Sequence, residues 1–197
     1  MIHQHKYVKE LLKRLKMEDT KESGTLIATA TKLDIYEPGS YFDQKLYRGI
    51  IGSLLYLTAS RSDIIFSVGL CNDSVGRFES YNSVFPIPTS FWAKKESHLT
   101  VVKRILRYLK GTTDLCIWYP NGSNVNLVGY VDVDYAGFLV DRKSTSGIGH
   151  FLGSCLVSWA NKKQNHIALS IIKAEYVVAA LVVLNCCGSI PTNGLWN

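Results

Sequence analysis

The chain has 197 residues, of which 47% are hydrophobic and 11% are aromatic. That apolar content is enough for one ordinary domain or two small ones, and it excludes a chain that is disordered throughout. Lys and Arg outnumber Asp and Glu by 22 to 16, and the resulting charge of +6 mildly favours polyanionic partners without naming one.

Targeting and redox signals are absent from the sequence. The N-terminal stretch MIHQHKYVKELLKRLK lacks the apolar core of a signal peptide, and the longest apolar run, 176–184, is too short to span a bilayer. We therefore expect an intracellular, non-secreted chain with no membrane partner. The five cysteines show no CxxC pair and no metal-ligand spacing, so reduced thiols are expected.

The N-terminal part has helical periodicity. Residues 5–17 predict an amphipathic helix, because apolar side chains recur at helical spacing between lysines: Val8, Leu11, Leu12 and Leu15. Residues 18–45 contain Gly, Pro, Thr and Ser without a clear period and predict a loop. The apolar stretch 47–71 is interrupted at 60–63, which predicts two helices separated by a turn.

A second helix with a basic face is predicted after a long loop. Pro86 and Pro88 block regular structure within 72–95, whereas Ser97 can cap a helix that ends at Gly111. Its expected buried stripe consists of Leu99, Val102, Leu106 and Leu109. Its cationic side chains lie mostly off that stripe and either hold phosphates or are merely solvated: Lys103, Arg104, Arg107 and Lys110.

From residue 115 the pattern changes to that of strands. Segments 115–120 and 125–134 flank the turn signal Asn121-Gly122 and predict a hairpin. Further strands on either side of Gly153-Ser154 extend it to a meander of three to four strands. A helix then begins at Ser170, and because it is apolar on most faces we expect it to be largely buried.

The stretch GYVDVDYAG contains two carboxylates two residues apart within an apolar run. In a strand, residues two apart share a face, so Asp132 and Asp134 would lie together, opposite Val131 and Val133. Strands disfavour paired like charges unless water or a cation such as Mg²⁺ neutralises them. An edge strand with a wet face is the alternative interpretation of this spacing.

Four long strings, in order, resemble the Ty1/copia class of retrotransposon polyproteins. They are YRGIIGSLLYLTASRSDI, SHLTVVKRILRYLKGTTDL, LVGYVDVDYAGFLVDRKSTSG and FLGSCLVSWANKKQNHIALS. They look like the stretch that runs from the end of the reverse transcriptase into the RNase H domain, and the resemblance extends from about Lys6 to about Ala180.

The resemblance implies an α+β fold with two main parts. Residues 1–111 would be a helical C-terminal, thumb- or connection-like segment of a reverse transcriptase, with an inserted loop near 79–95. Residues 112–188 would be a truncated RNase H-like β-meander with a packed helix, and 189–197 an irregular tail. The partners it implies are RNA/DNA hybrids or other nucleic acid, and the rest of a retroelement polyprotein.

The resemblance also implies a site. Asp132 matches the family's strand Asp, and Glu175 matches its helix Glu. Both would be catalytic residues that hold Mg²⁺ or Mn²⁺ ions, and these ions would promote hydrolysis of the RNA strand. Asp134 would be a neighbouring metal ligand. The residues expected to contact phosphates in this part are Arg142, Lys143, Lys162 and Lys163.

Departures from the family pattern lower the expected activity. Lys173 stands where the family has an acid, the family's next Asp has no counterpart, and no YxDD polymerase string occurs. We therefore expect a degenerate fragment that is inactive alone. The alternative is a non-catalytic remnant that binds nucleic acid through the basic face of the helix 97–111, with a salt-dependent affinity.

Overall fold

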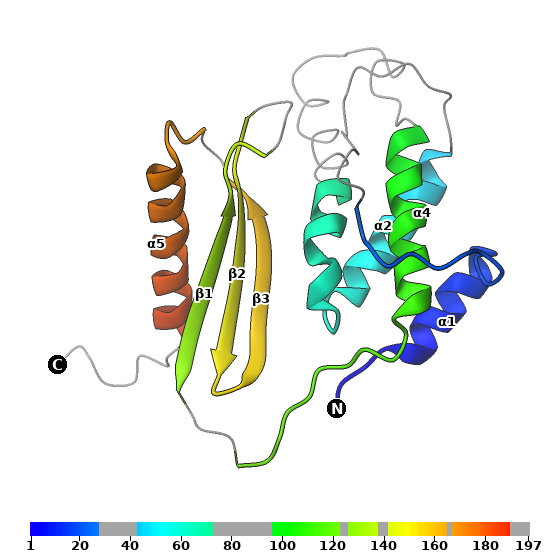
Figure 1. Cartoon of the computed structure of the whole chain (residues 1–197), viewed down its shortest axis with the longest axis horizontal. Coiled ribbons are helices and arrows are strands. Elements are labelled where there is room, and N and C mark those ends of the chain that lie inside the picture. Colours follow the sequence, from blue (N-terminus) through cyan, green and yellow to red (C-terminus); the bar gives the residue numbers. More distant parts are fainter. Residues whose placement is uncertain (28–42, 73–95, 123–125, 138–141, 165–166, 190–197) are drawn as a thin grey trace. The chain divides into compact units, whose positions relative to one another are not determined.

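The computed structural model divides the chain into two compact units, Met1–Trp118 and Tyr119–Asn197. It describes residues 1–27, 43–72, 96–122, 126–137, 142–164 and 167–189, and the expected loop near 79–95 lies outside them. The first unit is helical and the second contains the antiparallel sheet (Figure 1), so the described fold is of a mixed α and β class.

The helices of the first unit confirm the periodicity of the sequence. They are α1 (His5–Arg14), α2 (Gln44–Leu57), the short η1 (Ser62–Ile64), which continues into helical residues 65–72, and α4 (Glu96–Gly111). The carboxylate of Asp43 caps α2, since its Oδ1 accepts from the N–H groups of Lys45 at 2.8 Å and Leu46 at 3.4 Å. Ser97, predicted as the cap of α4, lies inside that helix instead.

The apolar stripes of these helices form one core. Leu11 of α1, Leu54 of α2 and Leu109 of α4 are all buried in it. On α4 the stripe is wider than predicted, because Val101 and Ile105 are fully buried while Leu99 is only partly so. A helix that packs against two neighbours needs such a broad apolar face.

The second unit contains the predicted meander. Strands β1 (Leu127–Asp134), β2 (Thr145–Leu152) and β3 (Cys155–Lys163) form an antiparallel sheet in the order β1-β2-β3. The turn between β2 and β3 uses Gly153 at a φ of 62°, which glycine adopts without steric cost.

The predicted hairpin of 115–120 with β1 is wrong. Ile117 forms an isolated bridge with Ile2, in which each N–H donates to the other's carbonyl at 2.9 Å. These hydrogen bonds hold Ile117 to the N-terminus within the first unit, and the segment is not paired with β1 in the sheet.

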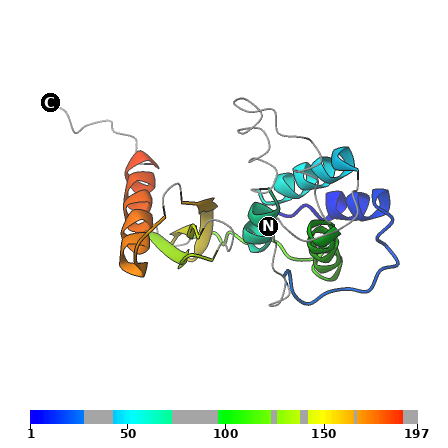
Figure 2. The same cartoon turned by 90° about the horizontal axis from the view of Figure 1, so that it is seen from above.

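Helix α5 (Ile171–Ser189) packs against β1 and β2 and runs beside the sheet (Figure 2). Ser170 Oγ accepts from the N–H of Lys173 at 3.3 Å and so caps the helix, which starts close to the predicted position. The expectation that this helix is largely buried is wrong: Ala174 and Val178 are buried, but Ile172 is 65% and Tyr176 74% exposed. A sheet of three strands covers only a narrow stripe of the helix.

Within the described residues, no helix has both the length and the apolarity to cross a membrane.

Candidate functional site

The two predicted carboxylates lie side by side on β1. The register pairs Asp132 with Gly147 and Asp134 with Thr145, so both acids share one face of the sheet. Val131 and Val133 pair with Ile148 and Ser146 on the opposite face, as predicted. Both carboxylates are exposed, which fits the wet face of an edge strand.

Local contacts orient the two carboxylates differently. Asp132 Oδ1 accepts from the N–H of Val133 at 2.9 Å. The carboxylate of Asp134 lies directly over Gly137, where a Cβ atom would overlap it. Glycine at 137 therefore lets Asp134 fold back onto the turn that follows β1.

The predicted helix ligand approaches the sheet from the other side. Gln164 Nε2 donates both to Ser146 Oγ and to the main-chain oxygen of Ala174, each at 3.1 Å. The buried stripe of α5 therefore meets the sheet face that carries Ser146, whereas Asp132 lies on the face of Gly147. Glu175 is exposed on α5, next to Ala174. The helix that carries Glu175 therefore packs on the sheet face opposite to that of Asp132.

The available donors do not fit a divalent cation. Mg²⁺ takes oxygen ligands in near-octahedral geometry, and two such ions in a hydrolytic site need converging carboxylates. Among the residues that the structure describes, no three His, Cys, Asp or Glu side chains gather into a group that could hold a metal ion. Asp132 and Asp134 alone are an incomplete ligand set.

The basic residues predicted around the sheet are dispersed. Lys162 pairs with Ser146 and Lys163 with Thr145, so their side chains leave opposite faces of the sheet. Arg142 is exposed and Lys143 partly buried in the segment before β2. The sheet register therefore separates the two lysines instead of forming one phosphate-binding row.

On α4 the basic residues have a structural role. Arg104 donates through Nε to the main-chain oxygen of Thr25 at 3.1 Å and through Nη2 to Thr25 Oγ1, while Lys110 Nζ donates to the main-chain oxygen of Thr20 at 2.8 Å. These contacts hold the segment after α1 against α4. Lys103 is exposed and Arg107 is partly buried, so this face offers fewer cations to a phosphate backbone than its sequence suggested.

Known proteins with similar sequences indicate the kind of protein from which this chain derives. The Pol polyprotein of transposon RE1 of Arabidopsis thaliana is 36% identical over 175 residues, which are 89% of this chain and 11% of RE1. That of transposon TNT 1-94 of Nicotiana tabacum is 33% identical over 90% of this chain and 13% of its own length. The chain is a homologue of the retrovirus-related Pol polyproteins of copia-type transposons.

This homologue spans only about a ninth of those Pol polyproteins. A shorter relative, secreted RxLR effector protein 161 of Plasmopara viticola, is 35% identical over 66% of this chain and 82% of its own length. No family model matches the chain, and no solved structure matches it.

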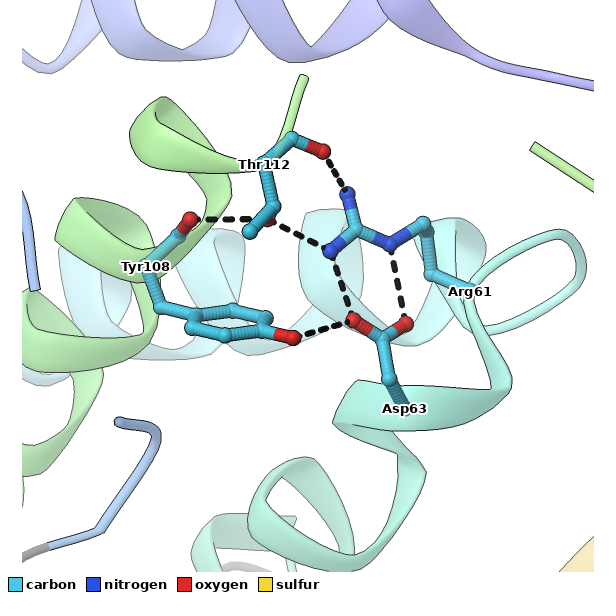
Figure 3. A network of polar contacts seen from close by, with 4 residues as sticks. All are labelled: Arg61, Asp63, Tyr108 and Thr112. Carbon is cyan, nitrogen blue, oxygen red and sulfur yellow. Dashed lines mark hydrogen bonds and ion pairs between the residues drawn. The ribbon is translucent and has the colours of Figure 1, made fainter. Parts of the chain in front are cut away.

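Among the described residues of this Pol homologue, a well-connected polar site lies in the first unit (Figure 3), and it was not predicted from the sequence. The Arg61 side chain, 5% exposed, donates to Asp63 through Nε at 2.9 Å and Nη2 at 2.6 Å. It also donates to the main-chain oxygen of Thr112 at 2.8 Å and to Thr112 Oγ1 at 2.7 Å. Tyr108 OH donates to Asp63 Oδ2 at 2.9 Å. The network joins η1 to the end of α4.

The electrostatics of this network favour the ion pair. Burial by itself raises the pKa of Asp63, but the hydrogen bonds and positive charge of Arg61 outweigh it and leave the pKa below its ordinary value. Burial and the hydrogen bond to Asp63 raise the pKa of Tyr108. The available sequence signal was the pair Arg61 and Asp63, two residues apart between apolar runs.

We expect acid to weaken the first unit through Asp63. Because its folded pKa is lowered, the stability that it contributes is complete above the ordinary Asp value of about 4 and is lost as the pH falls through the folded value. Urea unfolding of the chain at a series of pH values, followed by helical circular dichroism, measures this loss. An Asp63→Asn variant that loses stability in parallel with the wild type on acidification would contradict it.

Proposed function

We propose that this chain is a degenerate piece of the reverse transcriptase and RNase H region of a copia-type Pol polyprotein, and that it does not cut RNA/DNA hybrids by itself. Homology to the Pol polyproteins supports the origin. A helical unit followed by three antiparallel strands and a helix, with Asp132 on the first strand and Glu175 on the helix, supports the assignment to this region. Its partners in this proposal are the rest of the polyprotein and nucleic acid.

One observation supports the proposed loss of RNase H activity. Asp132 pairs with Gly147, and a Cβ atom at Gly147 would lie 3.8 Å from that of Asp132, whereas Ser146 faces the buried stripe of α5. Two-metal hydrolysis needs carboxylates that converge on ions about 4 Å apart. The buried stripe of α5 and Asp132 lie on opposite faces of the sheet, and no three candidate metal ligands gather within the described residues, so this arrangement supports an inactive fragment.

The test is hydrolysis of a labelled RNA/DNA hybrid by the full chain, supplied with Mg²⁺ or Mn²⁺. We expect no cleavage above that of an Asp132→Asn variant. Asp114→Asn, which removes a 94% exposed carboxylate of the first unit, is the matched control for a contaminating nuclease. Cleavage that is lost in both Asp132→Asn and Glu175→Gln but kept in Asp114→Asn would refute the proposal.

A further inference from the structure

One face of the sheet in the second unit is not used by α5. The helix approaches the face of Ser146, Ile148 and His150, which are buried. The other face, here called the open face, carries Tyr130 and Asp132 of β1, and Tyr130 is 61% exposed. One exposed ring is ordinary on a protein surface, whereas several apolar side chains that adjoin one another mark a binding surface.

Aromatic side chains from all three strands lie on the open face. Tyr130 and Trp159 pair with Gly149 from either side, in one row across the sheet. Phe151 lies on the same face, and its ring meets that of Tyr130 edge to face, with centroids 5.4 Å apart and an angle of 88°. This contact fixes the Tyr130 ring at the side of the row.

In the next row across the sheet, a glycine lies between two polar residues. Asp132 of β1, Gly147 of β2 and Asn161 of β3 lie in line across the sheet. Among the described residues, a Cβ atom at Gly147 would find only Asp132 within 4 Å, at 3.8 Å from its Cβ and 3.9 Å from its main-chain oxygen. The middle of the row is therefore open above Gly147, between a carboxylate and an amide and beside the Tyr130 ring.

The charge of the open face selects the kind of ligand. Asp132 and Asp134 are both exposed there, while Lys163 lies in the row of Asp134 on the far strand. A carboxylate beside an aromatic face attracts a cation and repels phosphate, which disfavours a nucleic-acid backbone at this gap. Arg suits the combination best, because its planar guanidinium stacks on aromatic rings and donates two parallel hydrogen bonds to a carboxylate.

We propose that the open face binds an arginine side chain of an extended basic peptide, with the guanidinium above Gly147, against the Tyr130 ring and paired with Asp132. The interaction is independent of RNase H chemistry and needs no metal. It uses side chains that are exposed on the sheet surface, so each can be replaced without opening the core.

The experiment is a nuclear magnetic resonance titration of the full chain, in EDTA, with a capped Gly-Ser-Arg-Ser-Gly peptide. We expect the amide signals of Gly147 and Gly149 to shift. Tyr130→Ala and Asp132→Asn should each weaken binding about two- to fivefold, given the strength of a cation–π contact or an exposed ion pair. Tyr176→Ala and Glu175→Gln remove an exposed tyrosine and an exposed carboxylate from α5 and should leave the affinity unchanged.

Three outcomes would overturn this inference. The amides of Gly147 and Gly149 could stay in place throughout the titration, or the two α5 controls could weaken binding as much as the open-face variants. A single-stranded oligonucleotide that shifts these amides when the peptide does not would assign the face to base stacking instead. Amide spectra of the free variants show whether each variant is folded. Because the titration does not measure hybrid cleavage, a negative result here does not contradict the proposed function.

Discussion

Replacing Arg61 with alanine is expected to lower the free energy of unfolding of the first unit by about 2–3 kcal/mol, because it removes a buried guanidinium and its hydrogen bonds to a partly exposed carboxylate. The guanidinium makes four hydrogen bonds to two residues, Asp63 and Thr112. Its loss leaves the carboxylate of Asp63, whose side chain is 29% exposed, with Tyr108 as its remaining side-chain donor in the network. Hydrogen exchange of the α4 amides in the full chain measures the change.

The control for this substitution is another arginine of the same unit. Arg14 Nη2 donates to Ser53 Oγ at 2.9 Å in an exposed hydrogen bond. Arg14→Ala should cost about 0.5 kcal/mol or less, as is usual for the surface. Arg61→Lys keeps the charge but loses the planar fork, so its cost should fall between the two. An Arg61→Ala variant as stable as Arg14→Ala would show that the network contributes little.

The sequence predicted the elements that local periodicity determines. The apolar spacing in 5–17 and 97–111 gave α1 and α4, and the alternation around Gly153-Ser154 gave β2 and β3 with their turn. The sharing of one face by Asp132 and Asp134 also follows from alternation alone, and the register confirms it. In each case the deciding information lies within a few residues of the element.

The wrong predictions involve partners that are distant in sequence. Residues 115–120 have a strand-like composition, yet Ile117 bonds to Ile2, and local pattern does not reveal that competitor. The apolar composition of α5 predicted burial, but burial depends on how much sheet lies beneath the helix. Arg104 and Lys110, predicted either to hold phosphates or to be solvated, bond to Thr25 and Thr20, and the local sequence does not reveal these contacts.

The face that a helix covers is also a property of the tertiary structure. Alternation places Asp132 on a face but does not say which face α5 will approach. Here the covered face is identified by Gln164, just after β3, which bonds to both Ser146 and the α5 backbone. A carboxylate pair inferred from family strings alone therefore needs the sheet register before it can be called a site.

Truncating Leu54 to alanine is expected to destabilise the first unit by about 2–5 kcal/mol, the range for deleting a buried leucine side chain from a core. Leu54 is fully buried on α2 among side chains of α1 and α4. The loss combines the transfer of the removed methyl groups to water with the cavity that the helices cannot close completely. Urea unfolding of the full chain, with hydrogen exchange at α2 and α4 amides, measures it.

The next residue of the same helix is the matched control. Leu55 is 40% exposed, and Leu55→Ala makes the same chemical change outside the core, so it should cost about 0.5 kcal/mol or less. The β2 amides should keep their protection in Leu54→Ala, because the sheet belongs to the other compact unit. Equal costs for the two leucine variants would contradict the packing of α2, and a parallel loss of β2 protection would show that the two units unfold as one.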